Sequence, residues 1–228
     1  MRTWPYEPDV AQIVLVDHAM VPDANDIARW IDSIQQHGSR LVRTGALFPH
    51  AAKAFTEAGF TTIDTLTLLD VRLDRVRIDH LRSTPAGRTA GTHRMRNHQI
   101  AELATIDRAA FGDPWGNDAA SVSEIASATP RHRARVIKAS GELLGYAISG
   151  LAGSNGYVQR IAVHPNAHGN GHGRTLLVDG LEWMHRRGAT RALVNTGVDN
   201  RVALDLYASC GFMRCPEQLV ILEATINR

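Results

Sequence analysis

Apolar residues follow two spacings that alternate along the chain: short β-branched runs, and apolar positions three or four residues apart. The first spacing is typical of strands and the second of helices, so the alternation predicts a mixed α/β architecture. In the N-terminal part it predicts a strand, a helix, a strand, a helix and a long strand at residues 11–20, 23–38, 39–47, 49–60 and 62–76. The segment 83–91, STPAGRTAG, has turn formers and no apolar anchors, which is typical of a linker between domains.

The same patterns continue after the linker. They predict a strand from 92, helices at 97–111 and 118–128, and a hairpin at 134–152 that turns at Ser140, Gly141 and Glu142. The remaining predicted elements alternate strand and helix, at 156–165, 174–188, 191–197, 199–212 and 218–226.

An internal repeat relates the two ends of the chain. A shift of 152 residues lays LVRTG at 41–45 on LVNTG at 193–197, and it also aligns Ala51 with Ala203, Phe55 with Tyr207, Gly59 with Gly211, and Phe60 with Phe212. One register explains every match, which favours a repeated structural unit. Coincidence between two αβ units with similar packing demands is the alternative.

Composition narrows the class of protein. With 228 residues, 44% of them hydrophobic, the chain is long enough to bury a core without disulfides. Only Cys210 and Cys215 are present, at a spacing that fits no zinc or redox motif, so we expect no metal and a cytoplasmic, reducing location. No signal peptide or apolar run of about 18 residues is found, and a net charge of +2 without a basic stripe favours neither membrane nor nucleic-acid binding.

A glycine-rich loop, His-Gly-Asn-Gly-His-Gly-Arg at 168–174, lies between a predicted strand and a predicted helix. Alternate glycines let successive N–H groups face one concavity, and the helix dipole adds positive charge, as in a pyrophosphate site. A tight structural turn is the alternative interpretation. His164, His168 and His172 recur every four residues, but Pro165 and the glycines exclude the helix that would gather them around a metal ion.

Two motifs in this region have a characteristic order and spacing. His168, Gly171 and Gly173 match a loop of the form Gln/Arg-x-x-Gly-x-Gly/Ala, except that histidine replaces the first residue. Further on, the form Asn-x-x-Ala-x-x-Leu-Tyr-x-x-x-Gly-Phe is matched by Asn200, Ala203, Leu206, Tyr207, Gly211 and Phe212. Together they resemble the GNAT superfamily of acyl-coenzyme A N-acyltransferases over about residues 92–226. The second motif is most similar to the branch that acetylates protein N-termini, the ribosomal-protein alanine acetyltransferases.

The resemblance implies a fold and a site. The fold would be a mixed, largely antiparallel sheet flanked by helices, and the activity an acetyl-CoA-dependent transfer of an acetyl group to a primary amine of a protein N-terminus or a small molecule. The strand at 158–163 would splay from its neighbour and pair with the pantetheine arm, the glycine loop would hold the pyrophosphate, and Tyr207 would be the catalytic acid that protonates the departing thiolate. The implied acetyl-CoA-binding residues are Ile161, Ala162, Val163, His168, Gly169, Asn170, Gly171, His172, Gly173, Arg174, Asn200 and Tyr207.

The sequence departs from the family pattern at the general base. Asn195 stands five residues before Asn200, where the most similar branch has a glutamate, and an amide cannot accept the proton. The base would then be a water chain or a histidine such as His164, or catalysis would run by positioning alone. A non-catalytic acyl-CoA-binding or assembly module therefore stays open as a second function class. The expected partners are acetyl-CoA and an amine acceptor, with the chain as a monomer or homodimer.

The repeat also predicts the domain organisation. Residues 1–82 would form a smaller, degenerate GNAT-like lobe, residues 83–91 the linker, and residues 92–228 the acetyltransferase domain. In the lobe, the segment between the first strand and its helix, VPDAND at 21–26, has two carboxylates and no glycine, so we expect it not to bind coenzyme A. Phe55 lacks the hydroxyl of Tyr207. An independent binding domain tethered by the linker is the alternative.

Overall fold

The computed structural model describes residues 2–15, 21–83 and 91–226, which fall into two compact units. Unit 1 is drawn from residues 1–68, 195–201 and 214–228, and unit 2 from residues 69–194 and 202–213. The chain therefore passes from one unit to the other several times. None of the helices in the described part of the chain is long and apolar enough to cross a membrane.

Unit 1 is built on a sheet with the strand order β1-β2-β3-β10-β4. Its core is formed by apolar side chains of α1, α2 and the strands, among them Ile27, Val42, Phe55 and Leu222. Strand β3 runs parallel to β2 and antiparallel to β10. The elements are β1 (Thr3–Trp4), β2 (Glu7–Ile13), α1 (Ala24–Gln36), β3 (Leu41–Thr44), α2 (Pro49–Glu57), the first part of β4 (Thr61–Arg72) and most of β10 (Met213–Thr225).

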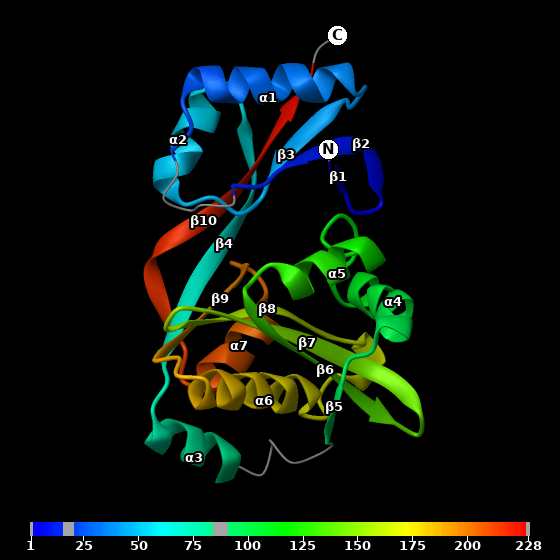
Figure 1. Cartoon of the computed structure of the whole chain (residues 1–228), viewed down its shortest axis with the longest axis vertical. Coiled ribbons are helices and arrows are strands. Elements are labelled where there is room, and N and C mark those ends of the chain that lie inside the picture. The colour runs from blue at the N-terminus through cyan, green and yellow to red at the C-terminus, as the bar shows by residue number, and fades with distance from the viewer. Residues whose placement is uncertain (1, 16–20, 84–90, 227–228) are drawn as a thin grey trace. The chain divides into compact units, whose positions relative to one another are not determined.

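Unit 2 contains strands in the order β9-β8-β7-β6-β5, antiparallel except for the parallel pair β8 and β9. Helix α6 covers one face of these strands, and α4 and α5 cover the other (Figure 1). The elements are α3 (Arg75–Ser83), β5 (Thr92–Arg94), η2 (Asn97–Gln99), α4 (Ile100–Phe111), α5 (Ala119–Ser127), β6 (Arg131–Ala139), β7 (Glu142–Ala152), β8 (Asn155–Val163), η3 (Pro165–Ala167), α6 (His172–Arg186), β9 (Arg191–Gly197) and α7 (Arg201–Ser209).

Alternation along the strands assigns side chains to the two faces. Ile137 and Ile161 pack with Leu176 of α6, whereas Val136 and Ala162 pack with Leu103 and the rest of α4 and α5. The sheet is thus buried on both faces, and the ends of β8 are held between helices. The predicted mixed, largely antiparallel sheet flanked by helices is confirmed.

The division into units differs from the predicted one. Strand β4 ends at Arg72 and helix α3 begins at Arg75, where the sequence pattern predicts a strand through Val76. Helix α3 belongs to unit 2 because Ile78 and Leu81 are buried in the same core as α6. Strand β10 belongs mainly to unit 1 because it pairs with β3, so the segments 1–82 and 92–228 do not coincide with the units. Within the predicted linker 83–91, residues 84–90 lie outside the described residues. The predicted strand 11–20 overlaps β2, but its residues 16–20 lie outside them too.

The repeat has a structural counterpart. Helix α2 spans residues 49–57 and α7 spans 201–209, so both ends obey the shift of 152 residues. The turns after them also match: Phe60 N–H donates to Phe55 O at 3.0 Å, and Phe212 N–H donates to Tyr207 O at 3.1 Å. Gly59 and Gly211 before these amides have φ values of 90° and 84°.

Candidate functional site

Strand β8 has an open edge on the side of its parallel neighbour. The β8–β9 ladder consists of three pairs only, Asn155–Arg191, Gly156–Ala192 and Tyr157–Leu193, and it ends there although β8 continues to Val163. On its other side, β8 stays paired with β7 as far as the Gly145–Val163 pair. The splay expected for residues 158–163 is therefore present in the structure.

Strand geometry decides which backbone groups face this open edge. His164 N–H donates to Leu144 O at 2.8 Å, so His164 is turned toward β7. Backbone groups alternate in direction along a strand, which turns Ala162 toward β7 and leaves Ile161 and Val163 facing the open edge. Of the three predicted strand residues, these two can pair with an added chain of amides, whereas the Ala162 side chain packs in the core below α4.

The glycine loop ends in an uncapped helix. Gly169 and Gly171 have φ values of 77° and 75°, the left-handed region that glycine adopts without strain. The first bond of helix α6 runs from Thr175 N–H to Gly171 O at 2.9 Å, and no side chain caps the helix. The N–H groups of residues 172–174 thus have no acceptor within the helix and point out of its positive end.

Gly173 lies where α6 passes close to α7 and β8. A Cβ at this position would lie 3.3 Å from the Leu206 side chain of α7 and 4.0 Å from Val163 of β8. His172, the first residue of α6, is buried, and its Nδ1 has no hydrogen-bond partner within the described residues. The loop therefore combines a close helix–strand contact with a set of donors that the protein itself leaves unused.

Two loop side chains make hydrogen bonds within the protein. His168 Nε2 lies 2.9 Å from Val163 O, so the ring is a donor to the open edge of β8. Arg174 is buried, and its Nη1 donates to Ser209 O at 3.3 Å, to Ser209 Oγ at 3.2 Å and to Cys210 Sγ at 3.1 Å. The predicted salt link from Arg174 to a phosphate is therefore not supported, because its side chain is held at the C-terminal end of α7.

Tyr207 is buried on helix α7 and packs against Phe212 with a distance of 5.5 Å between ring centroids. Burial raises the pKa of its phenol to about 12, although the nearby positive charge of Arg160 acts in the opposite direction. Tyr207 thus keeps its proton at neutral pH, as an acid must before it donates. It also stands 6% exposed in the apolar core, so the packing role expected of its counterpart Phe55 is present too.

A buried ion pair, missed by the sequence analysis, lies beside Tyr207. Asp107 of α4 is fully buried and accepts from Arg160 Nε at 2.8 Å and Nη2 at 2.6 Å, from Tyr146 Oη at 2.6 Å and from Asn117 N–H at 2.6 Å. The Arg160 guanidinium also stacks 3.5 Å from the Phe111 ring centroid. Burial, followed by the charge of Asp107, raises the pKa of Tyr146 well above its ordinary value, so that its hydroxyl remains a donor.

The hydrogen-bond partners of Asp107 and His164 decide whether either side chain is free to act as a general base. Asp107 accepts four hydrogen bonds and is held as a structural anion. His164 Nδ1 accepts the Asn166 N–H at 3.2 Å, which occupies the lone pair that a neutral ring would need as a base. Asn195 lies in unit 1. Among the described residues, no group of three or more His, Cys, Asp or Glu side chains is arranged to hold a metal ion.

The predicted site residues thus gather in one unit with a single exception. Ile161, Ala162, Val163, the loop 168–174 and Tyr207 all belong to unit 2. Asn200 belongs to the segment 195–201 of unit 1, where its N–H donates to Gly197 O at 3.0 Å. Its contact with the pantetheine strand stays a prediction.

Comparison with known proteins gives matches in both sequence and structure. A protein of Bacillus subtilis (strain 168), provisionally named as a ribosomal protein bS18-alanine N-acetyltransferase, is 27% identical over 122 residues, which cover 54% of this chain and 80% of the relative. The structure of a ribosomal-protein-alanine N-acetyltransferase from Escherichia coli matches with a TM-score of 0.50 at 19% identity, over 60% of this chain and 94% of the other. A tandem GNAT protein from the clavulanic acid biosynthesis pathway matches with a TM-score of 0.64 at 16% identity, over 90% of this chain and 70% of the other.

The family model for the Acetyltransferase (GNAT) family matches residues 100–212. This range contains the open edge of β8, the glycine loop, the uncapped end of α6 and Tyr207. Residues 100–212 therefore form an acetyltransferase domain of the GNAT family, and the protein is an acyltransferase.

Proposed function

We propose that this protein is an acetyl-CoA-dependent N-acetyltransferase that acetylates a primary amine, either a protein N-terminus or a small-molecule amine. The observation that carries the proposal is the juxtaposition, within unit 2, of an open strand edge and an uncapped helix N-terminus. Strand β8 ends at Val163 and α6 begins at His172, so a ligand with both amides and phosphates can engage both features.

The residues present fit acetyl-CoA, judged by the donors that the protein leaves unused. The N–H groups of residues 172–174 and the left-handed glycines 169 and 171 would hold the pyrophosphate. Backbone groups of Ile161 and Val163 would pair with the pantetheine amides, with the Val163 carbonyl already accepting from His168. When bound, acetyl-CoA supplies an activated acetyl group as a thioester.

Tyr207 would act as the general acid. Its phenol keeps the proton at Oη because burial raises the pKa to about 12, and we propose that it donates this proton to the departing sulfur. The nearby charge of Arg160 favours the tyrosinate that remains, which limits the penalty for that transfer.

The acceptor amine would have to arrive without its extra proton. The buried carboxylate of Asp107 is not available as a base, because four donors saturate it. Deprotonation of the amine would then fall to solvent, and the protein would contribute by positioning the reactants. Because a relative is named for acetylating a ribosomal protein alanine, a protein N-terminus is the first acceptor to test.

We further propose a single donor site per chain, with residues of unit 1 as a degenerate, cofactor-free copy. There, β2 pairs with β3 up to its last residue, and Gly45 N–H donates to Ile13 O at 2.7 Å, so no edge opens between them. The N-terminus of α1 is closed by its own side chains, since Asp23 accepts the Asp26 N–H and Asp26 accepts the Asp23 N–H. In unit 1, the counterparts of the open strand edge and of the uncapped helix end are thus both closed by the protein itself.

The test is a matched pair of substitutions at Gly169, where a Cβ would meet no atom within 4 Å and the φ of 77° is one that Asn and Asp tolerate. Gly169→Asp places a negative charge beside the pyrophosphate site, and we expect coenzyme A binding to weaken by about tenfold or more. Gly169→Asn has the same shape without the charge and should bind like the wild type. Calorimetry measures both affinities, and the wild-type titration should give one site per chain.

Equal affinities of the two variants would contradict the pyrophosphate site, and two sites per chain would contradict the cofactor-free copy. Release of coenzyme A in the presence of an alanine-terminated peptide, compared with the same peptide blocked at its N-terminus, tests the acceptor. Release that does not differ between the two peptides would remove protein N-termini from the proposal.

A further inference from the structure

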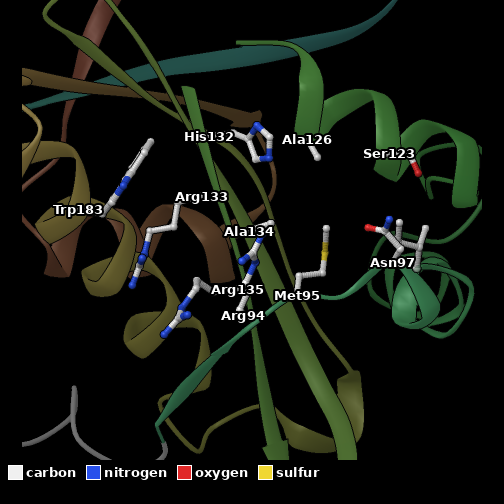
Figure 2. A pocket seen from close by; sticks show the side chains of 11 residues that line it. Arg94, Met95, Asn97, Ser123, Ala126, His132, Arg133, Ala134, Arg135 and Trp183 are labelled. Atoms are coloured by element: carbon white, nitrogen blue, oxygen red, sulfur yellow. The ribbon is translucent and has the colours of Figure 1, made fainter. Parts of the chain in front are cut away.

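A basic hollow lies at the edge of the unit 2 sheet that is opposite to β9, so it is separate from the open edge of β8. It has a volume of about 610 Å³ and is lined from β5, η2, the start of α4, α5, β6 and α6 (Figure 2). The lining residues are Arg94, Met95, Asn97, Ile100, Ser123, Ala126, His132, Arg133, Ala134, Arg135 and Trp183. Three of them are arginines, and none is acidic.

The hollow wraps around a bare strand edge. His132 and Ala134 lie on the α5 side of β6, whereas Arg133 and Arg135 lie on the α6 side, so residues from both faces can line one hollow only where the sheet ends. Strand β5 covers β6 at Arg135, Val136 and Ile137. Met95 N–H adds one more bond, to Ala134 O at 3.1 Å, and the chain then turns away into η2.

The next backbone groups along this edge are left without partners. Since Ala134 O points outward to Met95, alternation along the strand turns the N–H and C=O of His132 outward as well. No hydrogen bond to either group is formed within the described residues, and the His132 side chain is exposed. An extended peptide could therefore lie beside β6 where β5 has ended, and pair with the backbone of His132.

The charges around this edge are only partly compensated. Arg133 binds Asp179 at 2.6 Å and 3.0 Å, and Arg135 Nε lies 3.6 Å from the same carboxylate, so two guanidinium groups share one anion. Desolvation lowers the pKa of Arg135; the charge of Asp179 opposes this shift, and the neighbouring Arg133 adds to it. Arg94 is exposed and makes no contact with an acidic residue in the described part of the chain. A second hollow shares Arg94, Met95 and Asn97 and adds Arg96 and His98, again without an acidic residue.

We propose that this edge of β6 is a docking site for an acidic, extended peptide segment of a partner protein. The main chain of the segment would pair with His132, and its carboxylates would lie against Arg94 and the Arg133–Arg135 pair. Pairing with a strand edge requires a peptide backbone, and the excess of cationic side chains requires acidic ones. The hollow exposes no phenylalanine, tyrosine or tryptophan ring on which the bases of a nucleic acid could stack, and the single imidazole of His132 is a small platform, which disfavours RNA.

The experiment measures binding of a labelled peptide of alternating glutamate and valine to the full chain by fluorescence anisotropy. We expect Arg94→Ala to weaken binding by about tenfold, as for loss of a charge-assisted hydrogen bond. Arg75→Ala is the matched control, because this α3 arginine is 90% exposed, loses the same charge and does not line the hollow. The control should bind like the wild type, and added salt should weaken binding in both proteins.

Three further probes separate main-chain pairing from simple charge attraction. The same peptide with alternate amides N-methylated keeps its carboxylates but cannot pair with a strand edge, and we expect it to bind about tenfold more weakly or worse. A lysine–valine peptide should not bind. Equal binding of the methylated peptide, equal losses in Arg94→Ala and Arg75→Ala, or displacement of the peptide by a single-stranded oligouridylate at lower concentration would each overturn the proposal.

Discussion

Replacing Asp107 by leucine should destabilise unit 2 far more than any surface substitution. The carboxylate is fully buried and neutralises Arg160, whose side chain is only 18% exposed. Its removal leaves a buried guanidinium without a counter-charge, which costs about 3–5 kcal/mol. The buried Tyr146 hydroxyl loses its acceptor as well, which adds a penalty of about 1–3 kcal/mol. The total approaches the whole stability of a typical domain, so we expect strongly increased opening of the β7–β8 region.

A double-mutant cycle makes this reasoning quantitative. Arg160→Met removes the other charge, and the variant with both substitutions has no buried ion left, so it should be at least about 2 kcal/mol more stable than the sum of the single effects predicts. Asp79→Ala is the control, because its ion pair with Arg75 at 3.8 Å is exposed on both sides and contributes at most about 1 kcal/mol.

Amide hydrogen exchange along β7 and β8 is the appropriate assay, because it reports opening of unit 2 by itself, whereas a single unfolding free energy for a chain of two units is poorly defined. An Asp107→Leu protein whose protection in β7 falls by less than about 1 kcal/mol would refute the assignment of Asp107 and Arg160 as a mutually dependent pair. Additive single effects in the cycle would refute it as well.

Two predictions concern Tyr207. Tyr207→Phe keeps the ring packed against Phe212, so coenzyme A affinity should stay unchanged while turnover falls by about 10²–10⁴-fold; undiminished turnover would leave Tyr207 a packing residue only. The raised pKa also predicts that stability depends on pH, because the unfolded chain releases this proton near pH 10 and the folded protein only near pH 12. The contribution of the protonated phenol to the free energy of unfolding is complete below pH 10. It is lost between pH 10 and pH 12, by about 1.4 kcal/mol per pH unit. Exchange protection of α7 should therefore fall less steeply over this range in Tyr207→Phe, and identical pH profiles would contradict the burial of the phenol in solution.

Local patterns predicted the elements that carry the site well. The predicted strand 191–197 matches β9 at both ends, and Asp118 caps α5 by accepting the Ser121 N–H, as its position suggested. Of the predicted turn residues, Ser140 and Gly141 form the turn with positive φ values, whereas Glu142 already begins β7. In each case the signal is contained within a few neighbouring residues, such as a cap, a turn or a β-branched run.

Features that depend on distant residues escaped the sequence analysis. The segment Arg75–Ser83 alternates apolar and charged residues at its start, as a strand does, and becomes helix α3 because Ile78 and Leu81 reach the core of unit 2. The Asp107–Arg160 pair joins residues 53 positions apart. One signal could have revealed it: Asp107 falls beside Leu103 and Ile106 on the apolar face of its helix, where an unpaired carboxylate would be too costly to bury.

The interleaving of the two units along the chain has a consequence for biosynthesis. Strand β3 receives its partner β10 only after some 180 further residues have been made, since Leu41 pairs with Thr225 and Arg43 with Glu223. Arg43, which is buried between Glu7 and Glu223, likewise lacks one of its two counter-ions until β10 has left the ribosome. The N-terminal residues, although synthesised first, are thus completed last, and a chain arrested before β10 would expose the flank of β3 to chaperones and proteases.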